Sequence, residues 1–253
     1  MTLRGGEGDR TVVLLHGLGA NAEVWRPLTA VIEAEGGWRW IAPDLPGHGR
    51  AARLDAYSPG AMADALFPAL QAELPGALVL GHSLGGVVGL ALAAKAPVGR
   101  VVGLGIKVAW TEEEARGLAM LAAKPGKVID DRAAAVERAL KVAGLWGLVP
   151  ADGPAAEAGI VAVEGGWTLT MDPAANGVGA PDMSRLIAEA DCQVRLLRGE
   201  RDPMQTLDQL KALDPEAADL PGLGHSAMVE DPAAVWAAVL ADLRSGNEAP
   251  PPR

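Results

Sequence analysis

Short apolar runs recur along the chain, separated by longer stretches with helical composition. Most of these runs are uninterrupted by polar residues, as in parallel strands that helices cover on both faces. Residues 193–198 instead alternate polar and apolar positions, which indicates a strand nearer the edge of the sheet. We predict six strands, at residues 11–15, 38–42, 77–80, 100–106, 193–198 and 217–220.

The stretches between these runs predict the helices. The signals at their starts include Ser58 as an N-cap with Pro59 in the first turn. Strands that alternate with helices indicate an α/β protein with a mostly parallel sheet. The expected helices lie at residues 20–35, 59–73, 87–95, 204–213 and 231–243.

Residues 107–190 interrupt this alternation. Thr111, followed by three glutamates that end at Glu114, forms a capping box that predicts a helix to about residue 124. A second helix is expected at residues 131–142, and residues 144–182 are rich in Gly, Pro and Ala with weak strand signals. We expect this segment to be a mainly helical insertion; an irregular extension of the core is the other interpretation.

One turn places a serine between glycines. The predicted strand at residues 77–80 leads into Gly81-His82-Ser83-Leu84-Gly85, and a helix follows. In a turn this sharp, side chains at Gly81 and Gly85 would collide, and the Ser83 hydroxyl lies beside the free N–H groups of a helix N-terminus. A glycine-rich helix start with a capping serine is the alternative interpretation.

This turn resembles the nucleophile elbow of the α/β-hydrolase superfamily. Four further segments resemble motifs of that family in the expected order: His16-Gly17-Leu18-Gly19, residues 44–49, Gly199-Glu200-Arg201-Asp202 and Gly222-Leu223-Gly224-His225. The resemblance implies an α/β-hydrolase fold, with a mostly parallel sheet flanked by helices. It implies a discontinuous core at residues 1–106 and 191–244, a helical cap at residues 107–190, and a disordered tail at residues 245–253. The opening hairpin of the family is expected to be short or absent, which leaves the strand count open.

The resemblance also implies a catalytic triad. Ser83 would be the nucleophile, and His225 is the one histidine that follows it, as the family order of serine, acid and histidine requires. Asp202 is the expected acid, although it could instead cap the next helix, and Glu200 is the less favoured acid. The backbone N–H groups of Leu18 and Leu84 would form the oxyanion hole.

The other histidines and early carboxylates are given structural roles. We interpret Asp44 as an acceptor of backbone N–H bonds in its turn, His48 as a hydrogen-bonding loop residue, and His82 as packing behind the elbow. Four aspartates of the insertion are expected on solvated faces: Asp130, Asp131, Asp152 and Asp172.

These residues predict a serine hydrolase that cleaves a carboxylic ester, lactone or thioester of a small, largely apolar substrate, without cofactor or metal. Trp110, Trp146 and Trp167 either line its pocket or form the core of the cap. Two alternatives stay open. One is hydrolysis of a carbon–carbon bond in a diketone-like acid, for which Lys107 could bind a carboxylate. The other is a ligand-binding protein with an idle triad.

Composition narrows the range of partners and compartments. The net charge of −10 argues against nucleic acid or an anionic membrane as a partner. The single cysteine, Cys192, excludes an internal disulfide, and the first residues lack the apolar core of a secretory signal. The long uncharged stretch at residues 77–94 divides into a strand and a helix. We therefore expect a cytoplasmic monomer or homodimer that acts on a small molecule.

Overall fold

The computed structural model describes residues 1–245, so residues 246–253 of the expected disordered tail lie outside the described part. Within residues 1–245 the main sheet has seven strands, in the order β1-β3-β2-β4-β5-β8-β9. All six predicted strands are present and mutually parallel, and β1 pairs antiparallel with β3. The strands are β1 (Thr2–Gly5), β2 (Arg10–Leu15), β3 (Trp38–Pro43), β4 (Leu78–His82), β5 (Arg100–Leu104), β8 (Gln193–Gly199) and β9 (Ala218–Leu220). The strand β1, four residues long, was not among the predicted strands.

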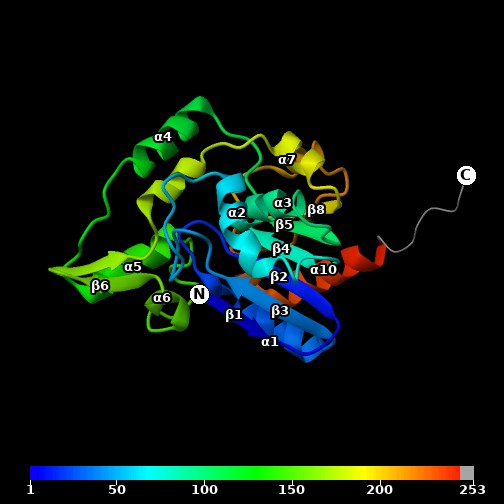
Figure 1. The fold of residues 1–253 in the computed structure, drawn as a ribbon, viewed down its shortest axis with the longest axis horizontal. Helices are drawn as coiled ribbons and strands as arrows, with labels where there is room; N and C mark the ends of the chain where they lie inside the picture. The colour runs from blue at the N-terminus through cyan, green and yellow to red at the C-terminus, as the bar shows by residue number, and fades with distance from the viewer. Residues whose placement is uncertain (246–253) are drawn as a thin grey trace, which may run out of the picture.

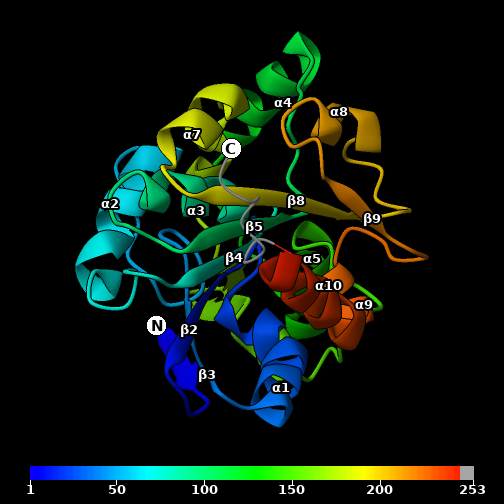
Figure 2. The same cartoon turned by 90° about the vertical axis from the view of Figure 1, so that its right-hand side faces the viewer.

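Helices cover both faces of this sheet (Figure 2). On one face α1 (Arg26–Glu35) packs against α10 (Pro232–Ser245), and on the other α3 (Leu84–Ala93) packs against α2 (Pro59–Leu70) and α7 (Met183–Glu189). Successive side chains of β2 enter opposite layers: Leu14 joins the core under α1, and Leu15 joins the core under α3. Burial on both faces explains why these strands read as continuous apolar runs.

Two predicted helices differ in extent from the sequence-based expectation. Residues 20–35 form a 3-10 turn, η1 (Ala22–Trp25), before α1 begins at Arg26, because Pro27 fits only the first turn of a helix. The helix expected at residues 204–213 is the shorter α8 (Leu207–Lys211), which opens with a capping box at Thr206. A short helix, α9 (Ala227–Glu230), precedes α10.

The segment between β5 and α7 contains both helices and strands. It holds α4 (Glu112–Ala122), α5 (Arg132–Val142), α6 (Pro154–Glu157), β6 (Ile160–Val163), β7 (Gly166–Leu169) and η2 (Pro173–Val178). The capping box at Thr111 and the N-cap Asp131 begin α4 and α5 as expected. The antiparallel β6–β7 pair was not expected, so the segment is not wholly helical. Figure 1 shows α4, α5 and this pair on the side of the molecule away from α10.

Candidate active site

The strand-to-helix turn at Ser83 is strained. Ser83 has φ 49° and ψ −119°, a backbone conformation that residues other than glycine rarely adopt. A Cβ atom at Gly81 would overlap the backbone of Gly86, and one at Gly85 would overlap the Leu15 carbonyl. The Ser83 amide donates to the Leu104 carbonyl at 2.8 Å, which fixes the turn to the end of β5. The glycines are therefore required by close approach, as the sequence predicted.

Ser83 lines a cavity of about 130 Å³ with mainly apolar walls. Leu18, from the loop after β2, and Leu84, the first residue of α3, line the same cavity. Within the described part of the chain, neither of their amide N–H groups donates a hydrogen bond. Two residues that line the cavity of the serine therefore have unused backbone donors, and their role as an oxyanion hole stays a prediction.

An imidazole and a carboxylate are in contact at the same edge of the sheet. His225 Nδ1–H donates to Asp202 Oδ2 at 2.9 Å, and the two residues follow the adjacent parallel strands β9 and β8. The Asp202 side chain is fully buried, whereas the His225 side chain is 26% exposed. A Cβ atom at Gly105 would lie 3.2 Å from Asp202 Oδ2 and 3.3 Å from His225 Nδ1, so the end of β5 approaches the pair closely.

The contact between the serine and the histidine stays a prediction. Among the hydrogen bonds of residues 1–245, none joins the Ser83 hydroxyl to the His225 ring. Both residues nevertheless lie next to the end of β5: Ser83 bonds to Leu104, and His225 lies against Gly105. Catalytic hydrogen bonds are often long in the absence of substrate and tighten when substrate binds.

Asp202 is held in its ionised form. Burial alone would raise the pKa of this carboxyl. The hydrogen bond and charge of His225, with smaller contributions from the Met204 N–H and the Gln205 amide, lower the pKa below its usual value. Asp202 Oδ1 accepts from the Met204 N–H at 2.9 Å, so the carboxylate also orders the following turn. Glu200 instead accepts from the Gly222 N–H at 2.8 Å.

The other three histidines are buried and hydrogen-bonded inside the fold. His82 Nε2–H donates to the His225 carbonyl at 2.9 Å, and the two rings are 4.7 Å apart. His16 Nε2 accepts from the Leu45 N–H at 2.9 Å, and His48 Nδ1–H donates to the Pro46 carbonyl at 3.0 Å. Burial lowers the pKa of His16 and His82 to about 3 and that of His48 to about 4. These rings are therefore neutral structural groups.

The roles predicted from the sequence for two aspartates, Asp44 and Asp172, have different outcomes. Asp44 accepts from the Ala22 N–H at 2.9 Å and the Arg50 N–H at 3.0 Å, which is the loop role expected of it. Asp172, expected on a solvated face, is half-buried and accepts from the Tyr57 hydroxyl at 2.9 Å. That expectation was wrong because the partner lies far away in the sequence, in the loop before α2.

Of the three tryptophans considered for the pocket, only Trp110 lines the Ser83 cavity. Trp146 is 47% exposed beside the Lys141 ammonium, and the Arg132 guanidinium lies over the Trp167 ring. The sequence did not single out three further lining residues, Leu118, Val178 and Met204. In the sequence, an apolar side chain that lines a cavity cannot be distinguished from one that packs in the core.

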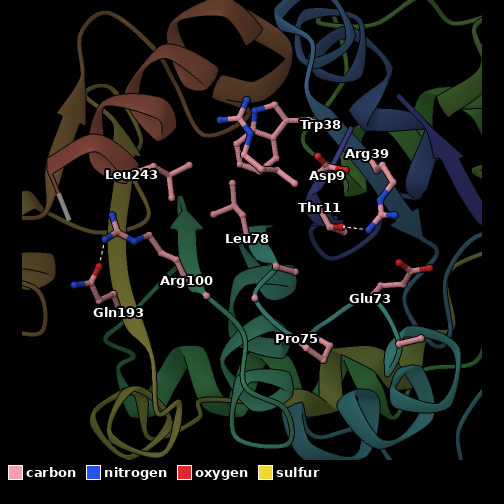
Figure 3. Close-up of a pocket in the computed structure, with 15 residues that line it drawn as sticks. Asp9, Thr11, Trp38, Arg39, Glu73, Pro75, Leu78, Arg100, Gln193 and Leu243 are labelled. Carbon is pink, nitrogen blue, oxygen red and sulfur yellow. Dashed lines mark hydrogen bonds between the residues drawn. The ribbon is translucent and has the colours of Figure 1, made fainter. Parts of the chain in front are cut away.

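A larger cavity, about 440 Å³, lies at the opposite end of the sheet (Figure 3). Its walls include the first residues of five parallel strands: Arg10, Trp38, Leu78, Arg100 and Gln193. The Thr11 hydroxyl there accepts from Arg39 at 2.9 Å, and among residues 1–245 no serine, cysteine or histidine lines the space. The smaller cavity is therefore the candidate active site, because it contains the strained serine and the free N–H donors.

Comparisons with known proteins agree with this architecture. A family model described as the alpha/beta hydrolase family matches residues 12–238. The chain therefore belongs to the alpha/beta hydrolase family, and the predicted fold class is confirmed.

Among solved structures, that of esterase Rv0045c from Mycobacterium tuberculosis superposes with a TM-score of 0.74 at 26% identity, over 96% of this chain and 87% of that one. In sequence the same esterase is 43% identical over 105 residues, which are 40% of this chain and 34% of the esterase.

Other relatives match over similarly short stretches. A magnesium-chelatase 30 kDa subunit from Rhodobacter capsulatus is 41% identical over 96 residues, which are 37% of this chain and 33% of the subunit. A pimeloyl-[acyl-carrier protein] methyl ester esterase from Serratia marcescens is 43% identical over 99 residues, which are 39% of this chain and 36% of the esterase. The alignments thus span about a third of the length of these curated relatives.

No helix within residues 1–245 is both long and apolar enough to cross a membrane.

Proposed function

We propose that this chain is a serine hydrolase that cleaves a carboxylic ester, lactone or thioester of a small, largely apolar substrate. The observation that carries the proposal is the hydrogen bond between His225 Nδ1 and the buried Asp202 carboxylate. A buried carboxylate on Nδ1 leaves Nε2 unprotonated and able to accept a proton, which is what a general base for Ser83 needs.

The first half of the reaction acylates the serine. His225 Nε2 takes the proton of the Ser83 hydroxyl as Oγ forms a bond to the substrate carbonyl carbon. The oxyanion that results accepts hydrogen bonds from the Leu18 and Leu84 amides. Collapse of this intermediate breaks the bond to the leaving oxygen or sulfur, which takes its proton from the His225 imidazolium. Asp202 stabilises that imidazolium throughout.

The second half releases the acid. A water molecule gives a proton to His225 Nε2 while its oxygen attacks the acyl carbon, and the Leu18 and Leu84 amides again hold the oxyanion. The bond to Ser83 Oγ then breaks, and the serine recovers its proton from His225. No step needs a cofactor or a metal ion, because the base, the nucleophile and the N–H donors all come from this chain.

The segment at residues 107–190 serves as the cap in this proposal, over a core at residues 1–106 and 191–244. Leu118 of α4 and Val178 of η2 line the cavity together with Leu84 and Val87 of α3. The cavity therefore lies between the two parts of the chain, as a substrate pocket beneath a cap would. Its small volume and apolar walls fit a short acyl or alcohol group.

The comparisons support ester cleavage more than any other activity. Two of the relatives described above are called esterases, and the structural likeness to one of them extends over nearly the whole chain. The magnesium-chelatase subunit is not named as a hydrolase, so a ligand-binding protein with an idle triad is the outcome to test against. We further propose a cytoplasmic monomer or homodimer whose partner is its small-molecule substrate.

A fluorophosphonate probe tests for an activated serine. We expect the wild-type protein to be labelled and Ser83→Ala to be unlabelled, with both variants folded by circular dichroism. A panel of short and long nitrophenyl esters, lactones, thioesters and a ring-fission diketone then defines the reaction. An unlabelled, folded wild-type protein would indicate the idle triad. Turnover of the diketone alone would favour carbon–carbon hydrolysis, in which Lys107, a residue of the cavity wall, would bind the substrate carboxylate.

Asp202→Asn tests the acid. The amide keeps the size of the side chain but cannot fix the same tautomer of His225, so we expect kcat to fall by about 10⁴ with the fold intact. Asp208→Asn is the matched control, because Asp208 is exposed in the first turn of α8. If Asp202→Asn turns over as fast as the control, the acid lies elsewhere, and Glu200→Gln is the next variant to measure.

A further inference from the structure

The cavity beside Ser83 contains one charged side chain. Among the described residues that line it, Lys107 is the only one with a charge, and the only other polar side chains are those of Ser83 and Asn176. Lys107 follows the end of β5, and its side chain is 17% exposed. The side chain is thus mostly covered, and an ammonium group beside apolar walls is stabilised by an accompanying anion. A carboxylate or a similar anion is therefore the kind of group that this lysine can bind at the cavity wall.

In the structure without substrate, that anion comes from α4. Lys107 Nζ forms an ion pair with Glu114 Oε1, while Glu114 Oε2 accepts from the Thr111 N–H at 2.8 Å in the capping box of α4. The Glu114 side chain is 44% exposed, so water competes with the lysine for it. No residue of α4 is buried. The ion pair thus ties a surface helix of the proposed cap to the wall of the substrate cavity.

We propose that Lys107 is a specificity-determining residue that selects substrates with a free carboxylate close to the scissile ester, such as monoesters of short dicarboxylic acids. The substrate carboxylate replaces Glu114 as the partner of the ammonium group. An ion pair among apolar walls is screened by water less than one that involves a half-exposed side chain, so we expect the substrate carboxylate to compete with Glu114. The inference rests on the proposed function, since it concerns the substrate of the same serine.

The exchange has a consequence for α4. Once a substrate carboxylate binds Lys107, Glu114 keeps only its capping-box bonds to Thr111. Glu114→Gln should reproduce this state without substrate, because glutamine also fits the third position of a capping box but carries no charge. In that variant Lys107 has no competing carboxylate, so the binding of an anionic substrate should improve.

The test compares two matched esters. One is monomethyl glutarate, and the other is the methyl ester in which an isopropyl group replaces the free carboxylate. We expect Lys107→Met to lower kcat/KM for the glutarate by about 10-fold to 100-fold, mainly through KM, because a charge-assisted hydrogen bond is lost. The loss on the isopropyl ester should be much smaller than the loss on the glutarate, because that ester has no carboxylate to pair with the lysine. Lys107→Arg should restore part of the preference, and Glu114→Gln should lower KM for the glutarate several-fold.

Two controls separate specificity from folding. Titration with the fluorophosphonate probe counts the competent serines in each variant, so a lower rate is not mistaken for misfolding. Lys124→Met, a lysine just beyond α4 that does not line the Ser83 cavity, should leave both esters unchanged.

The failure of this inference differs from the failure of the proposed function. Equal losses on both esters in Lys107→Met, or an unchanged KM for the glutarate in Glu114→Gln, would overturn the carboxylate assignment while ester hydrolysis stands. A wild-type protein that neither reacts with the probe nor cleaves either ester would overturn the function itself.

Discussion

Three buried histidines should make the protein lose stability in mild acid. His16, His48 and His82 are essentially inaccessible to solvent, and burial is the largest cause of pKa values lowered from 6.5 to about 3, about 4 and about 3. In the unfolded chain each ring takes up a proton near pH 6.5, whereas in the folded protein it stays neutral down to about pH 4. The unfolded state therefore binds more protons, and stability falls as the pH falls through 6.5.

The size of this effect follows from the pKa values. At pH 5.5, about one unit below the unfolded pKa, each ring lowers the free energy of unfolding by roughly 1 to 2 kcal/mol relative to pH 7.5, or about 4 kcal/mol for all three. That is a large part of a typical stability of about 5 to 15 kcal/mol. The carboxyls of Asp44 and Asp202 do not offset it, because their pKa values are lowered from 3.8 and both stay ionised at pH 5.5.

Urea unfolding followed by tryptophan fluorescence at pH 7.5, 6.5 and 5.5 measures the free energy directly. The control is His48→Gln, whose amide can still donate to the Pro46 carbonyl, and it should remove about a third of the pH dependence. A free energy of unfolding that is the same at pH 5.5 and 7.5 would refute the reasoning. So would an NMR titration in which the His82 ring takes up its proton near pH 6.5.

Two further predictions concern packing around the site. Gly85→Ala should cost more than about 3 kcal/mol in thermal unfolding, because its Cβ would overlap the Leu15 carbonyl. Gly117→Ala, in α4 with no atom near the new methyl group, should be neutral or stabilising by up to about 1 kcal/mol, and equal stability of the two variants would contradict the elbow geometry. Tyr57→Phe should lower stability by about 1 kcal/mol, because its hydroxyl donates to Asp172 and accepts from the Leu54 N–H. An unchanged melting temperature would show that these two bonds together contribute nothing.

The parallel strands could be predicted because each of them is buried on both faces. Val12 and Leu14 enter one core while Val13 and Leu15 enter the other, so no polar residue interrupts the apolar run. The elbow could be predicted for a different reason. Its glycines are required by backbone contacts within a few residues, so the constraint is visible in the local sequence.

Elements with weaker burial could not be predicted in the same way. β1 is four residues long and alternates exposed with half-buried positions, and three of the four residues of β6 are exposed. The alternation in β1 and the apolar run in β6, Ile160–Val163, each extend over only four residues, too few to distinguish a strand from other structure. The β6–β7 turn depends on the positive φ angles of Gly165 and Gly166, in a segment where many other glycines obscure the signal.

The surroundings of a side chain were the least predictable feature. The sequence offered Lys107 as a possible carboxylate ligand without indicating what would surround it. The environment of Lys107 is set by Trp110 and by Leu118 of α4, which line the same cavity, and by the ion pair of Lys107 with Glu114. The same holds for Asp172, whose partner Tyr57 lies 115 positions away. Such pairings depend on the tertiary fold and leave no local pattern.

The hydrogen bond from His82 to the His225 carbonyl joins the end of β4 to the loop after β9, 143 positions further along the chain. On the ribosome, the elbow with its serine is made long before β9 and the loop that follows it. On the proposed mechanism, a partly synthesised chain therefore has a nucleophile but no base to activate it. Hydrolysis can begin only after the last strand has joined the edge of the sheet, so unfinished chains should be harmless to the esters of the cell.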